Sequence, residues 1–183
     1  MAVTAERAIR RLTADEAIRM AEVGILRDDE PLELVDGVLV EMSPQGPLHS
    51  EAVAMLAERL RGAYAGTARI REEKPLDCGI HDLPEPDIAV VLGPAGAFAA
   101  RHPSGKECLL VIEVAMSSQE HDRAKASVYA AAGVPVYWLV DLAARVLEVR
   151  NDPGYRSCAT LSAGDEVELP RLGMTLAVSE LFP

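Results

Sequence analysis

The chain has 183 residues, 49% of them apolar and 26% charged, which is the composition of a globular protein with a sizeable core. Its 18 basic and 29 acidic residues give a formal net charge of −11, which opposes a general affinity for the nucleic-acid backbone. The three cysteines contain no C-x-x-C pair, and an odd number argues against a disulfide framework. We expect a single domain over residues 1–183, cytoplasmic, with no signal peptide and no membrane span.

The N-terminal part of the chain predicts a helix followed by a β-hairpin. Thr13 and Glu16 have the spacing of a capping box, so a helix begins there, and Gly24 is typical of its end. Residues 32–42 then alternate around Asp36-Gly37, a dipeptide typical of a two-residue hairpin turn.

His49 is the first residue that suggests chemistry. It follows a loop rich in proline and glycine, residues 43–48, and stands at the start of a predicted helix. A neutral imidazole in that position suits a metal ion, a water molecule or a phosphate oxygen. A histidine near a helix start is also commonly a capping or surface residue, so both interpretations stay open. Residues 67–76 predict a strand after this helix.

Asp87 and Glu113 lie at the ends of two apolar strands. Asp87 opens the strand at 88–92, and Glu113 stands near the end of the strand at 109–114. The connection at 93–107 is long enough for an antiparallel return, which would bring the start of one strand beside the end of the other. We therefore expect the two carboxylates to converge. A glutamate in such an apolar strand is costly to bury unless another group pairs with it.

Residues 108–142 predict a strand, a helix and a second, parallel strand. Ser117-Ser118-Gln119-Glu120 has the form of a capping box that starts the helix near Ser118, and Gly133 with Pro135 ends it. A crossover of this length joins parallel strands. Within the helix the residues that share one face are Asp122, Lys125 and Tyr129.

Two interpretations of these charged residues remain open. The Lys125 side chain leans toward the helix start and so toward Glu113, which makes an ordinary ion-pair cluster one interpretation. The other is a site in which Asp87 and Glu113 bind Mg²⁺ or Mn²⁺ while the ammonium faces a phosphoryl group or the attacking water. Basic side chains that could contact DNA locally, or simply form a solvated face, are Arg59, Arg61, Arg69, Arg71 and Lys74. The C-terminal strands predicted at 145–150, 155–161 and 175–178 carry no recognisable chemistry and suggest a dimer surface.

A set of short motifs between residues 12 and 182 has a recognisable order and spacing, although none is specific by itself. In chain order they are Glu33-Leu34-Val35-Asp36-Gly37, His49, Pro86-Asp87, Glu113-Val114, Ser117-Ser118, Asp122, Lys125, Tyr129, Gly133-Val134, Tyr137-Trp138-Leu139-Val140-Asp141 and Glu180-Leu181-Phe182. Together they resemble the bacterial Uma-two family of restriction-endonuclease-like proteins, a branch of the PD-(D/E)XK nuclease superfamily.

The resemblance implies a restriction-endonuclease-like core in which Asp87 and Glu113 bind the metal. One position departs from the superfamily pattern, because Ala115 stands where the (D/E)-x-K motif has its lysine. In Uma-two proteins the lysine lies on the following helix, and Lys125 matches that position. Glu33 belongs to a recurring E-L-x-D-G signature of the family, so it supports the site or else faces water. The resemblance also implies a homodimer.

We therefore predict an α/β fold with a restriction-endonuclease-like core, a mixed β-sheet flanked by helices, and additional β-hairpins. The predicted function is metal-dependent endonucleolytic hydrolysis of DNA phosphodiester bonds with Mg²⁺ or Mn²⁺. Asp87, Glu113, Lys125, His49 and Glu33 are the candidate catalytic residues, with Asp122 and Tyr129 as orienting groups. Two alternatives are a catalytically lapsed nuclease fold that serves as a binding module, and a metal-dependent hydrolase of a small phosphorylated substrate.

Overall fold

The computed structural model describes residues 9–27 and 29–183. Its elements are α1 (Ala14–Glu22), β1 (Leu32–Val35), β2 (Val38–Glu41), α2 (Pro47–Ala63), β3 (Arg69–Glu72), β4 (Ile88–Val91), η1 (Gly105–Glu107), β5 (Cys108–Ala115), α3 (Gln119–Ala132), β6 (Tyr137–Asp141), β7 (Val146–Arg150), β8 (Ala159–Leu161), β9 (Glu166–Leu169), β10 (Met174–Ala177) and η2 (Val178–Leu181). Within the described ranges, no helix has the length and apolar character needed to cross a membrane.

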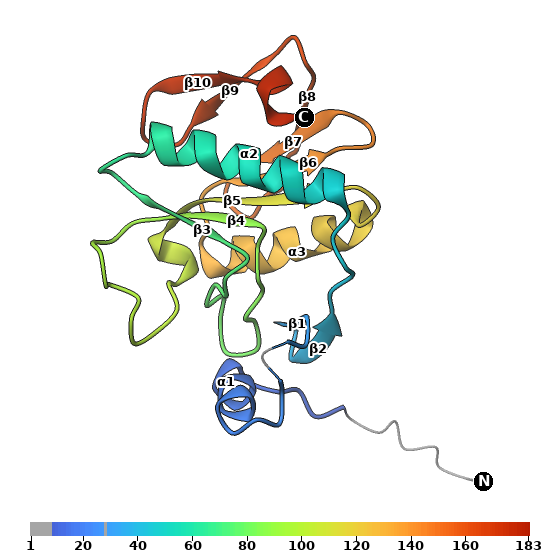
Figure 1. Cartoon of the computed structure of the whole chain (residues 1–183), viewed down its shortest axis with the longest axis vertical. Helices are drawn as coiled ribbons and strands as arrows, with labels where there is room; N and C mark the ends of the chain where they lie inside the picture. Colours follow the sequence, from blue (N-terminus) through green and yellow to red (C-terminus); the bar gives the residue numbers. More distant parts are fainter. Residues whose placement is uncertain (1–8, 28) are drawn as a thin grey trace, which may run out of the picture.

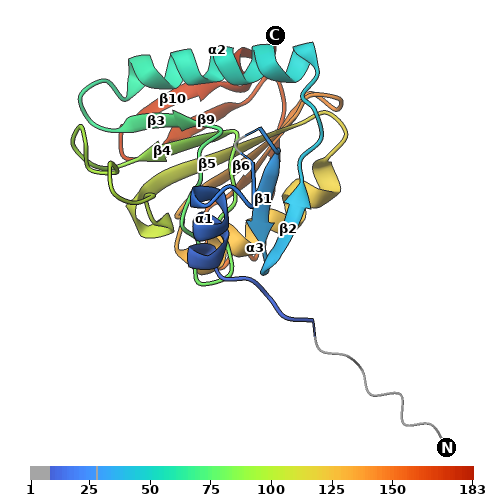
Figure 2. The same ribbon diagram turned by 60° about the horizontal axis from the view of Figure 1, so that its bottom comes forward.

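A six-stranded mixed sheet forms the centre of the molecule, in the order β3-β4-β5-β6-β7-β8. Only the β5–β6 pair is parallel, as expected for two strands joined by helix α3, and the other neighbours pair antiparallel. The helix α2 lies over one face of this sheet and α3 under the other, as Figures 1 and 2 show. The central strands are therefore covered on both faces.

Alternation along β4, β5 and β6 divides the apolar core into two layers. Side chains such as Ile88, Ile112 and Trp138 pack with α2, η2 and the β9–β10 hairpin. Side chains of opposite parity, such as Val111 and Leu139, pack with α3. Glu113 has the parity of the second group, so its carboxylate lies on the face that α3 covers.

The antiparallel β4–β5 pair confirms the predicted convergence of Asp87 and Glu113. Ile88 at the start of β4 pairs with Ile112 near the end of β5. Asp87 directly precedes β4, so it comes level with Glu113. The strand predicted at 67–76 is present but shorter, as β3.

Helix α3 begins and ends where the sequence predicts, but its N-terminal capping is different. Ser118 is the N-cap residue and makes no side-chain capping bond. Its hydroxyl donates instead to Asp122 Oδ2 at 2.6 Å. The predicted capping box between Ser117 and Glu120 was wrong, because the N-cap lies one residue later, at Ser118, which puts His121 rather than Glu120 at the third helical position. Gly133 ends the helix with φ +84°, a left-handed conformation that suits glycine.

Two short hairpins complete the fold. The β1–β2 hairpin turns at Asp36 and Gly37, both with positive φ, and so confirms the predicted turn. The β9–β10 hairpin lies on the same side of the sheet as α2 (Figure 1). The capping box of α1, between Thr13 and Glu16, is present as predicted.

Candidate functional site

Asp87 and Glu113 are joined by two backbone hydrogen bonds at the shared end of β4 and β5. The Asp87 amide donates to Glu113 Oε2 at 3.2 Å, and the Val114 amide donates to Asp87 Oδ2 at 2.7 Å. Each carboxylate therefore accepts a bond from the backbone of the other strand. The Asp87 side chain is 14% exposed, whereas that of Glu113 is 3% exposed. Asp87 is thus the carboxylate that faces solvent.

Helix α3 supplies the groups that hold the inner oxygen of Glu113. Lys125 Nζ lies 2.8 Å from Glu113 Oε1, and the Tyr129 hydroxyl donates to the same oxygen at 2.6 Å. Both residues are on the predicted helix face, and both are buried. Glu113 Oε1 is therefore occupied by two strong donors, while Oε2 accepts, from the described residues, the Asp87 amide alone.

Glu33 enters the cluster from the β1–β2 hairpin. Its Oε2 lies 3.0 Å from Lys125 Nζ, so the ammonium bridges Glu33 and Glu113. The Glu85 amide also donates to Glu33 Oε2, at 3.3 Å. The Glu33 side chain is 2% exposed, so it does not face water.

His121 is a member of the cluster that the sequence gave no reason to select. Its Nε2 lies 3.2 Å from Glu33 Oε1, and its side chain is 46% exposed. The partners are 88 residues apart in the sequence, so no local pattern joins them. Its position three residues from Ser118, in the first turn of α3, was the only available signal.

His49 contacts Asp87 on the opposite side of the cluster. Its Nε2 lies 3.3 Å from Asp87 Oδ1, because α2 begins beside the start of β4. The bond to Asp87 raises the pKa of His49, burial opposes this, and the Val114 carbonyl beside the ring raises it further. His49 Nδ1 is buried without a hydrogen-bond partner among the described residues.

The cluster contains more buried acid than buried base. Glu33, Glu113 and Asp122 are each at most 6% exposed, and the buried ammonium among them is Lys125. Burial raises the pKa of Glu113, and the carboxylates of Asp87 and Asp122 add to the rise, although Lys125 opposes it. Burial also raises the pKa of Asp122. The region would therefore be stabilised by an added cation.

The pKa values of Glu33 and Lys125 are shifted in the directions that favour the charged forms of both side chains. Burial alone would raise the pKa of Glu33, but Lys125, His121 and the Glu85 amide together lower it below its usual range. Burial likewise disfavours the Lys125 ammonium, yet Glu113 and Glu33 raise its pKa overall. The pair is thus ionised inside the fold.

The donor atoms at Asp87 and Glu113 suit a hard divalent cation. They are carboxylate oxygens, and Mg²⁺ is commonly held by one or two carboxylates together with water and substrate phosphates. Among the described residues, no group of three histidine, cysteine or acidic side chains is arranged to hold a metal ion. A site built wholly from protein ligands, as for structural zinc, does not fit these residues.

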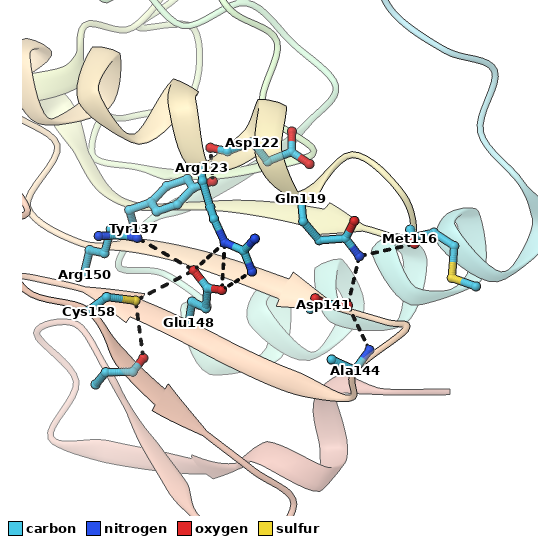
Figure 3. Close-up of polar contacts among 11 residues, drawn as sticks. Met116, Gln119, Asp122, Arg123, Tyr137, Asp141, Ala144, Glu148, Arg150 and Cys158 are labelled. Atoms are coloured by element: carbon cyan, nitrogen blue, oxygen red, sulfur yellow. Dashed lines mark hydrogen bonds and ion pairs between the residues drawn. The ribbon is translucent and has the colours of Figure 1, made fainter.

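A separate set of contacts fixes the N-terminal half of α3 to β6 and β7 (Figure 3). Arg123 Nε lies 2.9 Å from Glu148 Oε1, and Glu148 is 8% exposed. Gln119 donates to Asp141 Oδ1 at 3.1 Å, and the Tyr137 hydroxyl donates to the Asp122 carbonyl at 2.8 Å. These contacts set the position of the helix that carries Lys125 and Tyr129.

Of the five basic residues predicted to contact DNA, two pair with acids, and Arg69 and Arg71 donate to the Pro94 and Pro75 carbonyls. Arg59 pairs with Glu180, and Arg61 pairs with Glu72. Lys74 is exposed and forms no ion pair with any described residue. The backbone beside Lys74 is joined to the site, because the Glu73 amide donates to the Asp87 carbonyl at 3.2 Å.

Two hollows open on the surface, one of them beside the cluster. One of about 390 Å³, between α3 and the β1–β2 hairpin, reaches Lys125 and His121. The other, of about 710 Å³, lies between α1 and the loop at residues 98–102. Neither includes Asp87 or Glu113, so they give no support to a closed pocket for a small substrate at the carboxylates.

A mixed central sheet with acidic residues at the shared end of two paired strands is typical of the restriction-endonuclease-like class. A crystal structure described as a "putative nuclease" from Anabaena variabilis has the same fold, with a TM-score of 0.77 and 20% sequence identity over 93% of this chain and 97% of that one. No curated protein matches the chain. The family model for Uma2, described as "Putative restriction endonuclease", matches residues 14–179. The chain therefore belongs to the Uma2 family, which confirms the resemblance and the predicted fold.

Proposed function

We propose that this protein is a Mg²⁺- or Mn²⁺-dependent endonuclease that hydrolyses phosphodiester bonds in DNA. The observation that carries the proposal is the excess of buried carboxylate around Asp87 and Glu113. Buried acids are costly unless a cation neutralises them. Here the buried ammonium of the cluster, Lys125, is already paired with both Glu33 and Glu113. Membership of a nuclease-like family supports the same conclusion.

The proposed metal ligands are Asp87 and Glu113 Oε2, since Glu113 Oε1 is occupied by Lys125 and Tyr129. A divalent cation bound there would lower the pKa of a water molecule and stabilise negative charge on the phosphoryl oxygens. Lys125 holds Glu113 in place and adds positive charge beside the reacting phosphate. His49 orients Asp87 through its contact with Oδ1.

Plasmid nicking tests the proposal. With Mg²⁺ or Mn²⁺, the wild type should convert supercoiled plasmid to the open circle, and EDTA should stop the reaction. Glu113→Gln should abolish nicking, because an amide is a poor ligand for a hard cation. Glu168→Gln, on the exposed face of β9, is the matched control and should nick like the wild type. Nicking by Glu113→Gln at the wild-type rate would overturn the proposed site.

The catalytically lapsed fold is the second candidate. It is favoured by the net charge of −11, by Ala115 in place of the motif lysine, and by the pairing of Arg59 and Arg61 with acids. A lapsed fold would show no nicking with either metal on any DNA. The homodimer remains a prediction on both accounts, and sedimentation of the wild type tests it.

A further inference from the structure

We infer that the substrate is nucleic acid with locally unpaired bases, which the side chains of Leu48 and Met116 contact beside the carboxylates. This inference rests on the proposed nuclease function and names its substrate class. It begins with two large apolar side chains that are exposed next to the site. Leu48 is 45% exposed and Met116 is 50% exposed.

Both apolar side chains are tied to the site through their neighbours. Leu48 precedes His49, whose Nε2 contacts Asp87 Oδ1 at 3.3 Å. Met116 lies two residues after Val114, whose amide donates to Asp87 Oδ2 at 2.7 Å. The two residues belong to different elements, the first turn of α2 and the loop after β5, which lie near each other in Figures 1 and 2.

The loop that carries Met116 is held in place rather than loose. Gln119 donates to the Met116 carbonyl at 3.3 Å and to Asp141 Oδ1 at 3.1 Å. Figure 3 shows the Met116 side chain pointing away from this network. The apolar group is thus presented on a fixed backbone, which is the condition for a defined contact.

The charges around the site disfavour binding of intact double-stranded DNA. Proteins that bind duplex DNA commonly neutralise about six to ten phosphates with basic side chains. Here Arg59 and Arg61 are paired with Glu180 and Glu72, and the exposed cations without an ion pair to a described residue are Arg69 and Lys74 among those predicted to contact DNA. The net charge of −11 adds long-range repulsion. Affinity must then come largely from contacts other than phosphates.

Unpaired bases are the part of a nucleic acid that apolar side chains can contact. Leucine and methionine insert between base steps, and this costs least where the bases are already unstacked. A single strand also carries a lower charge density than a duplex, so an acidic protein repels it less. The two exposed apolar side chains and the small number of unpaired cations therefore both favour nucleic acid with unpaired bases.

Binding by fluorescence anisotropy tests the inference, with labelled oligothymidine and a blunt duplex of equal length, in Mn²⁺ and again in EDTA. The wild type should bind oligothymidine at least tenfold more tightly than the duplex. The variant Leu48→Gln/Met116→Gln should lose roughly tenfold in affinity for oligothymidine, the scale of one lost base contact. The control variant Ile25→Gln/Met174→Gln replaces two other exposed apolar residues, 65% and 52% exposed, and should bind like the wild type.

Equal affinity for the two DNAs, tighter binding of the duplex, or no binding of either would overturn the inference. So would a double variant at positions 48 and 116 that binds like the wild type. Calorimetry with Mn²⁺ on the same samples distinguishes failure of this inference from failure of the proposed nuclease function. Metal binding without strand preference counts only against the substrate class, whereas absence of metal binding counts against the proposed function.

Discussion

At the scale of single residues, Lys125 is central because it is a buried ammonium between two buried carboxylates. Its side chain is 5% exposed, and Nζ lies 2.8 Å from Glu113 and 3.0 Å from Glu33. An ammonium taken out of water needs such partners, and each carboxylate in turn needs the ammonium. The residue therefore stabilises the fold at the same place where it would act on the substrate.

Replacing Lys125 by methionine should destabilise the protein strongly. The change keeps the length of the side chain but leaves Glu33 and Glu113 buried without their cation, which typically costs about 3–5 kcal/mol. Adding Glu33→Gln should recover part of the loss, so the two changes should be non-additive. Urea unfolding of the single and double variants measures this. A loss for Lys125→Met below about 1 kcal/mol, typical of exposed pairs, would contradict the buried-pair account.

At the scale of secondary-structure elements, the placement of α3 determines the site. One side of the helix presents Lys125 and Tyr129 to Glu113, while Arg123 holds Glu148 of β7 on the other (Figure 3). The helix is thus fixed between two strands that are not neighbours in the sheet. Its register along β5 and β6 decides which side chain reaches the carboxylates.

Glu148→Gln should loosen the first half of α3 without unfolding the protein. It weakens the charge-assisted bonds to Arg123, at a cost of about 1 kcal/mol because Arg123 is half exposed. Amide hydrogen exchange should speed up near Asp122 more than in α2. Glu166→Gln, which changes an exposed carboxylate of β9, is the control and should leave α3 unaffected. Unchanged exchange in α3 would show that Arg123 and Glu148 do not hold the helix.

The turn η1, which leads into β5, should make the stability of the fold depend on pH in the acid range. Arg101, together with the Ser104 amide and hydroxyl, lowers the pKa of Glu107 to about 2. A carboxyl with a lowered pKa stabilises the fold above its usual pKa, and this contribution is lost as the pH falls from about 4.5 toward 2. Urea midpoints should therefore fall more over this range for the wild type than for Glu107→Gln. Parallel pH curves would contradict the prediction.

At the scale of the whole molecule, most of the fold followed from local patterns. Turn residues, helix ends and strand alternation predicted the Asp36-Gly37 hairpin, the limits of α3 and the antiparallel β4–β5 pair. Those features depend on neighbours in sequence or on one strand pairing. The capping of α3 was mispredicted because the N-cap is Ser118 and not Ser117, so Glu120 does not stand at the third helical position.

The site was predictable only where periodicity and strand ends define it. Asp87, Glu113 and Lys125 lie where helix and strand geometry place them. The contact of His121 with Glu33 was not predictable, because it depends on how the β1–β2 hairpin packs beside α3. The pairing of Arg59 with Glu180 likewise joins residues 121 apart in the sequence, so no local pattern predicts it.

Calorimetric titration of Mn²⁺ into the wild type and Asp87→Asn tests the central claim most directly. Asp87 is the more exposed of the two proposed ligands, so its amide variant removes a metal ligand with little change in packing. The account predicts saturable binding to the wild type and loss of binding in Asp87→Asn. Asp29→Asn, an exposed change in a pair with Arg27, should bind like the wild type. Absence of binding to the wild type, or equal binding to Asp87→Asn, would contradict the account.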